Sequence, residues 1–157
     1  MSGYSIDANV IIDLNRDMPE DVHVGIWAEF RQLVAEGRAR MSREAAEELK
    51  GVDDGCYAIA KGMSGFVVDG TQEEINLAAA ISNRFPKWVQ KKRNAADPFV
   101  IAHAKVHNLT VVTGERVNGP GWEEQNLKIP TVATLYDVTC VNIVGLSRDE
   151  GWTFSSA

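Results

Sequence analysis

Four acidic residues stand where their side chains could bind a cation together. Asp7 ends a strand-like run of residues 3–7, and Glu115 lies just past the carboxyl end of the β-branched run "LTVVT". Glu48 belongs to a short helical segment, and Asp97 opens another. In open sheets of parallel strands, ligands bind outside the carboxyl ends of the strands. We therefore expect the four carboxylates to converge on one crevice.

Convergence of four carboxylates has a chemical consequence. Like charges repel, and burial raises the pKa values of carboxyl groups, so the cluster needs a counter-charge. Oxygen ligands of this kind suit Mg²⁺ or Mn²⁺. Such ions, placed beside a phosphate, activate a water and stabilise the leaving oxygen. The pattern indicates metal-dependent hydrolysis of phosphodiester bonds.

Each acid also has a simpler interpretation. Asp97 precedes Pro98 and could only cap a helix. Glu48 is one of three glutamates in its segment and could be a solvated helical residue, and Glu115 could be a loop residue. Asp7 is the hardest to dismiss, because its neighbours are apolar.

Composition limits the classes of protein that fit. The 157 residues suit one domain spanning 1–157, and the net charge of −6 offers no global basic field for nucleic acid. Cys56 and Cys140 share no metal-binding spacing and are expected to be reduced. The sequence shows no secretory signal and no apolar run of the roughly 20 residues that span a bilayer. These features predict a cytoplasmic protein.

Apolar runs and helical periodicity alternate along the chain. Short apolar strands without polar alternation favour a parallel sheet covered on both faces, hence a three-layer α/β/α sandwich with a mainly parallel central sheet. Ser42 is expected to cap one helix, and Thr71 with Glu74 forms a capping box. Strands are expected at 3–7, 39–41, 66–69, 109–113 and 140–144. Helices are expected within 19–38, at 43–50, 54–62, 72–84, 86–93 and 97–108, and within 129–138.

Four successive blocks of the chain resemble those of PIN domains. They read "SIDANVIID", "AAEELKG", "AADPFVIAHAKVHNLTVVTGE" and "KIPTVATLYDVTCVNI". The third and fourth blocks are similar to those of a bacterial PIN-like subfamily with D-P-x-x-I-A-x-A, V-V-T-x-E and K-I-P. The resemblance implies an α/β/α nuclease, of which many are VapC-type toxins that cut RNA with Mg²⁺ or Mn²⁺.

The resemblance also implies roles for single residues. Asp7 and Asp97 match the acids expected to bind metal directly. Asn9 matches the polar residue that orients the site. Glu48 precedes Leu49 as the family glutamate does, and it is chosen over Glu47 for that reason.

The fourth corner of the expected site departs from the family pattern. Thr113 matches the family threonine that hydrogen-bonds within the site. Glu115 stands where many PIN domains carry aspartate, and Val117 occupies the place where a further acid often follows. Glu123 or Glu124 could compensate from the loop.

Basic residues precede Asp97 in "FPKWVQKKRNAAD". Lys91, Lys92 and Arg93 could line an RNA-facing rim, with Trp88 stacking a base. Alternatively, the cations are solvated at a helix end, and we favour a core position for Trp88. A second, weaker basic patch comprises Arg38, Arg40 and Arg43.

His103 and His107 are four residues apart in an expected helix, a spacing that can hold a metal. With no third ligand nearby in the sequence, packing at the surface or in the core is the favoured interpretation.

The leading hypothesis is a Mg²⁺- or Mn²⁺-dependent ribonuclease, the toxin of a toxin–antitoxin pair. Its implied partners are RNA, a cognate antitoxin and a second copy in a homodimer. The first alternative is an inactive PIN-like module that binds RNA or a partner. The second is a phosphotransferase with Asp7 as nucleophile, which is disfavoured because such enzymes usually carry aspartate where this chain has Asn9.

Overall fold

Five parallel strands form the central sheet of this protein, seen in a computed structural model that describes residues 2–52, 55–90 and 93–155. Their order across the sheet is β3-β2-β1-β4-β5, and every pairing is parallel. The bounds are β1 Tyr4–Ile6, β2 Ala39–Ser42, β3 Val67–Val68, β4 Thr110–Val112 and β5 Cys140–Val141. The predicted parallel α/β architecture is confirmed.

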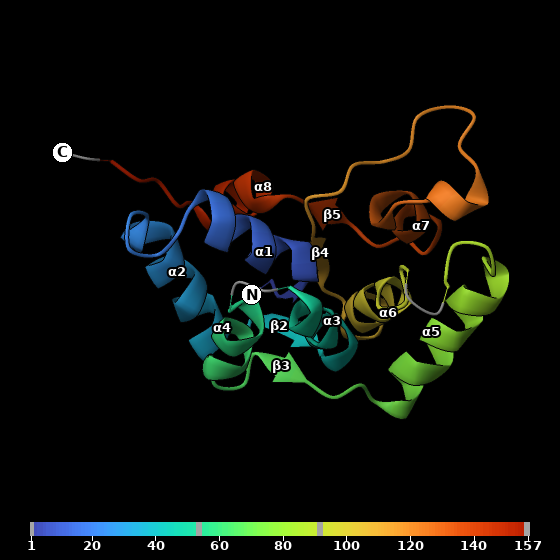
Figure 1. Cartoon of the computed structure of the whole chain (residues 1–157), viewed down its shortest axis with the longest axis horizontal. Coiled ribbons are helices and arrows are strands. Elements are labelled where there is room, and N and C mark those ends of the chain that lie inside the picture. The colour runs from blue at the N-terminus through green and yellow to red at the C-terminus, as the bar shows by residue number, and fades with distance from the viewer. Residues whose placement is uncertain (1, 53–54, 91–92, 156–157) are drawn as a thin grey trace.

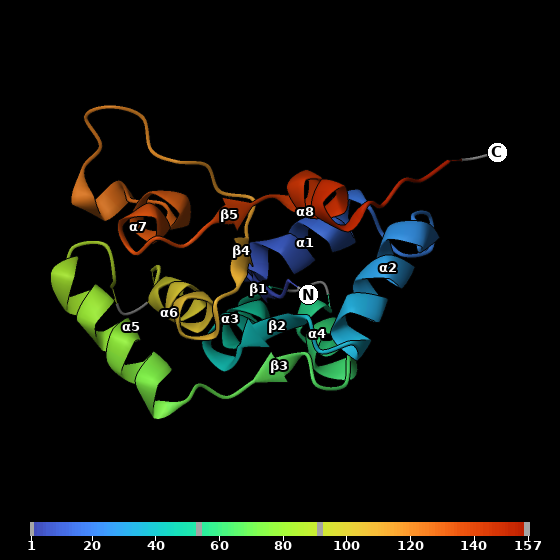
Figure 2. The ribbon, with the colours of Figure 1, turned by 180° about the vertical axis from the view of Figure 1, so that it is seen from behind.

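Helices on both faces complete three layers. Figures 1 and 2 show one group of helices, α5, α6 and α7, on one side of the sheet. A second group on the other side includes α1, α2 and α8. The helices are α1 Ala8–Asp17, α2 Val24–Ala35, α3 Arg43–Glu48, α4 Cys56–Gly62, α5 Gln72–Arg84, α6 Asp97–His107, α7 Ile129–Leu135 and α8 Ile143–Glu150. Two short 3₁₀ helices are η1 Leu49–Gly51 and η2 Glu124–Asn126.

The strand order places a switch point between β1 and β4. From β1 the chain crosses to β2 and then β3, whereas β4 and β5 lie on the other side of β1. Tyr4 pairs with Ala39 on one side and with Thr110 on the other. Such a reversal opens a crevice at the carboxyl ends of the two strands, which are the ends that carry Asp7 and Thr113.

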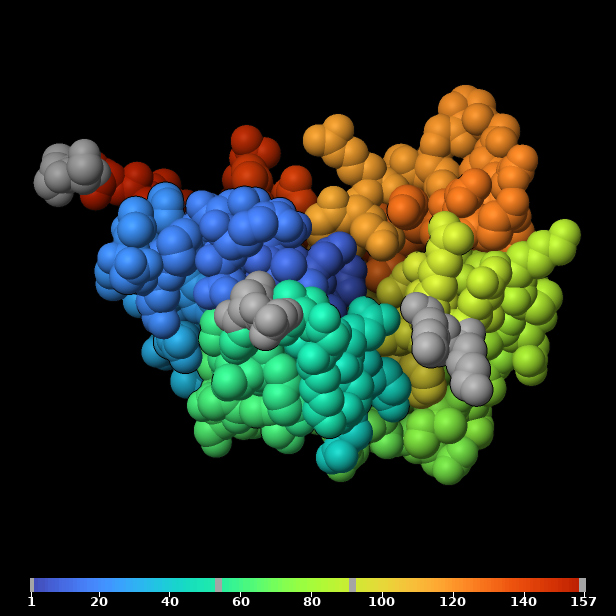
Figure 3. Space-filling view, viewed as in Figure 1, coloured from blue at the N-terminus to red at the C-terminus, as the bar shows by residue number. Residues whose placement is uncertain are grey.

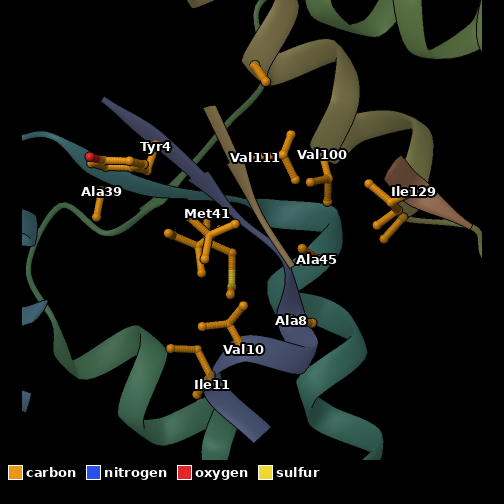
Figure 4. Packing of buried hydrophobic residues seen from close by; sticks show 14 of the residues in the cluster. Tyr4, Ala8, Val10, Ile11, Ala39, Met41, Ala45, Val100, Val111 and Ile129 are labelled. Atoms are coloured by element: carbon orange, nitrogen blue, oxygen red, sulfur yellow. The ribbon is translucent and has the colours of Figure 1, made fainter. Parts of the chain in front are cut away.

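Apolar side chains on both faces of the sheet hold the layers together. Figure 4 shows Met41 of β2 near Val10 and Ile11 of α1, while Val100 of α6 lies beside Val111 of β4. All five are buried. Removal of this apolar surface from water, at roughly 25 cal/mol per Å², is the main force that positions the helices around the strand ends.

A polar contact fixes α6 against the central strand. The Ser5 hydroxyl of β1 donates a hydrogen bond of 2.9 Å to the carbonyl oxygen of Val100, and both residues are buried. This bond ties the register of α6 to β1. It thereby sets the position of the first residue of α6 relative to the end of the strand.

Several predicted capping features are present. The Ser42 hydroxyl accepts a hydrogen bond from the Ala45 amide, as expected for the N-cap of α3. Thr71 and Glu74 form the predicted capping box at the start of α5. Within the described part of the chain, no helix is long and apolar enough to cross a membrane.

Some expected elements are wrong. Residues 8–17 form α1, which was not predicted. Residues 86–90 form a turn that ends in an isolated bridge between Gln90 and Arg93, so the described part of 86–93 contains no helix. The last strand ends at Val141, and 143–150 is helical because Asn142 caps α8 by accepting a hydrogen bond from Gly145. The helix expected within 19–38 is present as α2, which begins at Val24. Residue 54, at the expected start of α4, lies outside the described residues.

Candidate metal centre

Asp7 is held at the end of β1 by its neighbour on β4. It is 4% exposed, and the Thr113 hydroxyl donates a hydrogen bond of 2.8 Å to Asp7 Oδ2. The Thr113 hydroxyl oxygen in turn accepts a hydrogen bond of 3.1 Å from the Glu115 amide. Because its own proton is directed to Asp7 and its lone pair to Glu115, Thr113 fixes one carboxylate oxygen of Asp7.

Asp97 is the first residue of α6 and is buried, with 6% of its surface exposed. The N-cap position belongs to Ala96, and no side-chain capping bond is found at this helix start. Capping therefore does not account for Asp97, and the simpler interpretation of this residue is wrong. Its carboxylate is buried at a positive helix end without making the bond that usually places an acid there.

Burial and neighbouring carboxylates make both aspartates costly to ionise. Burial raises the pKa of Asp7 to about 7, opposed by the hydrogen bond from Thr113 and reinforced by the charges of Glu115 and Glu48. Burial, then the charges of Asp7, Glu115 and Glu48, raise the pKa of Asp97 to about 9. Both changes mean that the negative charge of this cluster lacks sufficient compensation from the protein itself.

Glu48 faces this cluster more directly than Glu47. Burial raises the pKa of Glu48, opposed by a hydrogen bond from the Ala96 amide and reinforced by the charge of Glu115. That bond places the Glu48 carboxylate beside the start of α6. Glu47 lies on the same rim, but it is paired with Lys50 at 2.6 Å in an exposed contact.

Asn9 and Glu115 fasten the loop that follows β4. Asn9 Oδ1 accepts a hydrogen bond of 3.2 Å from the Gly114 amide. A Cβ at Gly114 would lie 3.1 Å from Asp13 Oδ2, so a larger residue there would require the Asp13 side chain to shift by a few tenths of an ångström. Glu115 Oε2 accepts a hydrogen bond of 2.7 Å from the Ile129 amide at the start of α7. One oxygen of Glu115 is therefore engaged, and the other is left for a ligand.

These side chains border an open cleft of about 610 Å³. Figure 3 views the face on which the dark-blue start of the chain meets the teal, olive and orange segments. The cleft is lined by Asp7, Asn9, Glu48, Asp97 and Glu115 among others. The donor set is rich in carboxylate oxygen, which fits Mg²⁺ or Mn²⁺ better than a softer metal.

Among the described residues, one cation lines the cleft and a second acts on Asp97 electrostatically. Arg93 is exposed and lines it, whereas Lys91 and Lys92 lie outside the described residues. Lys128, the N-cap residue of α7, was not predicted to take part, yet its charge opposes the rise in the pKa of Asp97. The sequence places Lys128 directly before the helix that begins at "IPTV", but it does not reveal that Lys128 lies near Asp97, because that proximity depends on tertiary packing.

Other predicted positions lie elsewhere. Glu124 accepts a hydrogen bond of 2.7 Å from the Lys87 amide, and Glu123 contacts Gln125, so neither lines the cleft. The hypothesis that Glu123 or Glu124 replaces the acid missing at Val117 is therefore wrong, because neither residue lines the cleft. Trp88 is fully buried, which confirms its core assignment.

The second basic patch is engaged within the protein. Arg38 binds Glu150 through two nitrogens, at 2.8 and 2.5 Å. Arg43 is paired with Asp69. Arg40 directs Nη1 towards the Val34 carbonyl oxygen at 3.4 Å. These arginines serve contacts inside the fold, so the patch is not a free basic surface.

The sequence analysis disfavoured a metal site at His103 and His107 because no third ligand lies nearby in the sequence, and this reason is wrong. Glu74, far away in sequence, lies against His103 and His107, and one ligand atom from each residue falls within 4.8 Å of the others. A third ligand is therefore present, although no spacing in the sequence could reveal it.

Comparison with solved structures defines the class of fold. The chain is similar to FitAB in a structure titled as bound to an IR36 DNA fragment, with a TM-score of 0.54 and 21% identity over 89% of this chain and 94% of that one. It is also similar to FitAcB from Neisseria gonorrhoeae, with a TM-score of 0.53 and 20% identity over 90% and 98% of the two chains. The fold is PIN-like, a three-layer α/β/α sandwich.

The sequence family is defined as well. Residues 4–154 match the family described as Domain of unknown function (DUF4411), and the chain belongs to it. A comparison with curated proteins gives no significant match.

Proposed function

We propose that this protein is a divalent-metal-dependent endoribonuclease and the toxin of a toxin–antitoxin pair. The observation that carries the proposal is the pair of buried aspartates, Asp7 and Asp97, at the switch point of a PIN-like sheet. Their raised pKa values mean that burial is costly without a bound cation. A metal-dependent nuclease site would explain why two aspartates are buried here despite this cost.

Asp7 and Asp97 are proposed to hold Mg²⁺ or Mn²⁺ directly. Glu48 and the second oxygen of Glu115 complete the acidic set, while Thr113 and Asn9 fix its geometry through the hydrogen bonds described above. A bound divalent ion would supply an activated water at neutral pH and stabilise charge on the phosphate.

Substrate contacts are proposed at the basic edges of the cleft. Arg93 lines the cleft, and Lys128 is close enough to act on Asp97 electrostatically. Cations there would attract the phosphate backbone despite the acidic net charge of the chain. Lys91 and Lys92, which precede Arg93 in the sequence, are proposed to bind RNA together with it.

The toxin assignment rests on the likeness of the sequence blocks to VapC-type PIN domains. Val22 and Val24 near the start of α2 and Phe154 are large apolar residues that remain exposed, which suits an antitoxin or a second copy of the chain. A cytoplasmic location is part of this proposal, because RNA and the antitoxin would be met there.

One observation favours a second candidate, an inactive PIN-like module that binds RNA or a partner. Glu115 Oε2 accepts a hydrogen bond from the Ile129 amide, so this oxygen is already oriented by the fold and bidentate metal binding by Glu115 is disfavoured. Combined with Val117 at the place of a further acid, this arrangement weakens one corner of the site. Bound Mn²⁺ without cleavage of any substrate would favour this candidate.

Cleavage of a mixed panel tests the proposal. Transfer RNA, ribosomal RNA and single-stranded oligonucleotides would be incubated with Mn²⁺, Mg²⁺ or EDTA and wild type, Asp7→Asn or Asp17→Asn. Asp17 is an exposed acid at the end of α1, paired with Arg16, and serves as the matched control. We expect metal-dependent cutting by wild type and Asp17→Asn and none by Asp7→Asn. Equal cutting by folded Asp7→Asn would overturn the mechanism.

A further inference from the structure

A second group of potential metal ligands lies at the other end of α6. His103 and His107 are one turn apart on α6, and Glu74 reaches them from the first turn of α5. Glu74 Oε1 contacts His103 Nδ1 and lies 3.4 Å from His107 Nε2. Figure 1 shows α5 and α6 side by side. The three ligand atoms come from two helices that pack directly on each other.

This group is separate from the acidic cleft. His103 and His107 follow Asp97 by six and ten residues on one helix, which corresponds to about 9 and 15 Å along its axis. An ion bound by the histidines would therefore be distinct from one bound by Asp97.

His103 is buried without being fully satisfied. It is 6% exposed, and its Nε2 has no hydrogen-bond partner among the described residues. Buried polar atoms without a partner are rare and cost free energy. The contact with Glu74 accounts for only one of its two ring nitrogens. Nδ1, and not the unpartnered Nε2, faces Glu74, so Nδ1 is the candidate ligand atom and its contact with Glu74 Oε1 is the geometry that carries the site.

The surroundings allow an ion to enter and be held. A pocket of about 330 Å³ borders Glu74, His103 and His107, and the His107 side chain is 42% exposed, so the site has a route from solvent. Glu74 Oε2 accepts a hydrogen bond from the Thr71 amide, which orients the carboxylate while leaving Oε1 towards the histidines. Oriented ligands of this kind bind metal more tightly than mobile ones.

The charge balance points to moderate affinity. Arg40 lines the same pocket and disfavours a cation. Asp69 also lines it, but it is paired with Arg43. The negative charge of Glu74 is the main attraction for an ion.

We propose that Glu74, His103 and His107 form a site for a transition-metal ion of the Zn²⁺ class that clamps α5 to α6. Two imidazole nitrogens and one carboxylate oxygen suit Zn²⁺, whereas Mg²⁺ prefers oxygen ligands throughout. The ion takes the place of the proton that Glu74 and His103 share in their close contact. Three protein ligands leave a position for water on the pocket side.

The site is tested by titrating metal-stripped protein with Zn²⁺ alone and measuring the affinity and stoichiometry of binding by calorimetry. His107→Ala removes one ligand but leaves the Glu74–His103 contact and the capping box, so the fold should survive. His23→Ala is the matched control, because His23 is an exposed histidine outside the cluster. Asp97→Asn separates this site from the acidic cleft. A second titration is run with millimolar Mg²⁺ to occupy the cleft.

Wild type, His23→Ala and Asp97→Asn should each bind one Zn²⁺ here in the presence of Mg²⁺, and His107→Ala should bind it at least about tenfold more weakly. The chain has three histidines, so imidazole ¹⁵N spectra give a direct second readout. Zn²⁺ should shift the signals of His103 and His107 and leave His23 unchanged. No stoichiometric binding by wild type would overturn the proposal, as would equal binding by folded His107→Ala. Loss of all Zn²⁺ binding in Asp97→Asn would assign the ion to the cleft instead.

Discussion

The carboxylates at the two ends of β1, partly buried at one end and buried at the other, are compensated in opposite ways. At the start of β1, the Tyr4 hydroxyl donates a hydrogen bond of 2.5 Å to Glu150 on α8, and Arg38 binds the same carboxylate through two nitrogens. Burial raises the pKa of Glu150, but the bonds from Arg38 and Tyr4 outweigh it and leave the pKa below its ordinary value. At the other end, Asp7 and Asp97 are buried together and their pKa values rise.

The difference lies in the supply of positive charge. The start of β1 carries a guanidinium that matches Glu150, so this cluster is complete and stabilises the fold. At the cleft, Lys128 opposes the rise in the pKa of Asp97 only after burial and three carboxylates have raised it. This contrast agrees with the proposed metal site: the protein itself compensates the carboxylate of Glu150, and it leaves the proposed metal ligands Asp7 and Asp97 without a matching cation.

The largest effect is expected on the rate of RNA cleavage, where substitutions at the two ends of β1 should differ most. Asp97→Asn should reduce metal-dependent RNA cleavage to the metal-free background, because it removes a proposed direct ligand. Glu150→Gln should leave cleavage close to wild type, because this residue lies at the other end of β1. Rates measured at a temperature where both variants are folded check this. A large loss in Glu150→Gln with Asp97→Asn unaffected would reverse the assignment of the two clusters.

The Asp97→Asn substitution, which is expected to abolish cleavage, should raise the stability of the metal-free fold at alkaline pH. Since the folded pKa values of Asp7 and Asp97 lie near 7 and 9, above the ordinary 3.8, the metal-free fold binds more protons than the unfolded chain. The free energy of unfolding in EDTA should therefore fall as pH rises from about 4 to about 9, by on the order of a few kcal/mol. Asp97→Asn should flatten this decline and be more stable than wild type at pH 8.

Glu150 contributes with the other sign. Its pKa is lowered, so its stabilisation is present above about pH 4.5 and is lost as the pH falls through the folded value. Glu150→Gln should lower the free energy of unfolding at pH 8 by about 1.5–3 kcal/mol, the range for hydrogen bonds to charged groups. Urea denaturation in EDTA across this pH range measures both variants. A stability that rises from pH 5 to 9 in wild type and in Asp97→Asn alike would contradict the account.

Neighbouring glutamates sharpen the comparison within the cleft. Glu48→Gln should reduce cleavage by about 10–100-fold, because Glu48 faces Asp97 through the Ala96 amide. Glu47→Gln should have little effect, since Glu47 is an exposed partner of Lys50. Steady-state rates at saturating Mn²⁺ distinguish them. Equal losses in both variants would mean that the rim charge, and not one ligand, matters.

Thr113 tests the orientation of Asp7. Thr113→Val removes the hydroxyl that donates to Asp7 Oδ2 and keeps a similar volume. The apparent affinity for Mn²⁺ should weaken about tenfold, and Thr113→Ser should restore most of it, because serine retains the donor. Activity measured as a function of Mn²⁺ concentration gives the result. A failure of serine to rescue would point to packing as the role of Thr113.

The smallest effect is expected at the substrate edge. Arg93→Ala should weaken RNA binding and reduce the slope of affinity against salt by about 0.7, as expected for one lost phosphate contact with a single strand. It should leave Mn²⁺ affinity unchanged. Fluorescence anisotropy at several salt concentrations checks both points. An unchanged slope would remove Arg93 from the RNA-binding rim.

Local patterns predicted much of the fold. The strand-like run before Asp7 indicated β1, the β-branched run "LTVVT" indicated β4, and the Thr71–Glu74 spacing indicated the capping box that opens α5. The start of α8 was wrongly predicted as strand because "CVNIV" is β-branched, although the Asn142 cap decides that region. Strand propensity is a weak guide where a side chain can cap a helix.

The residues of the candidate site were easiest to predict where short motifs end strands or begin helices, whereas the choice of Glu48 came from the family resemblance. Asp7, Asp97 and Thr113 are such positions. The bond from Ile129 to Glu115 and the approach of Glu74 to His103 join residues far apart in sequence, so they depend on tertiary packing. Spacing within one helix identified the histidine pair but could not supply its third partner.

Binding of Mn²⁺ to the cleft tests the central claim most directly. Free Mn²⁺ would be followed by electron paramagnetic resonance during titration of wild type, Asp97→Asn and Glu150→Gln at pH 8. We predict that wild type and Glu150→Gln bind Mn²⁺ alike, and that Asp97→Asn binds at least about tenfold more weakly. Equal binding by wild type and Asp97→Asn, or no binding by wild type at millimolar Mn²⁺, would contradict the claim that the buried aspartates await a cation.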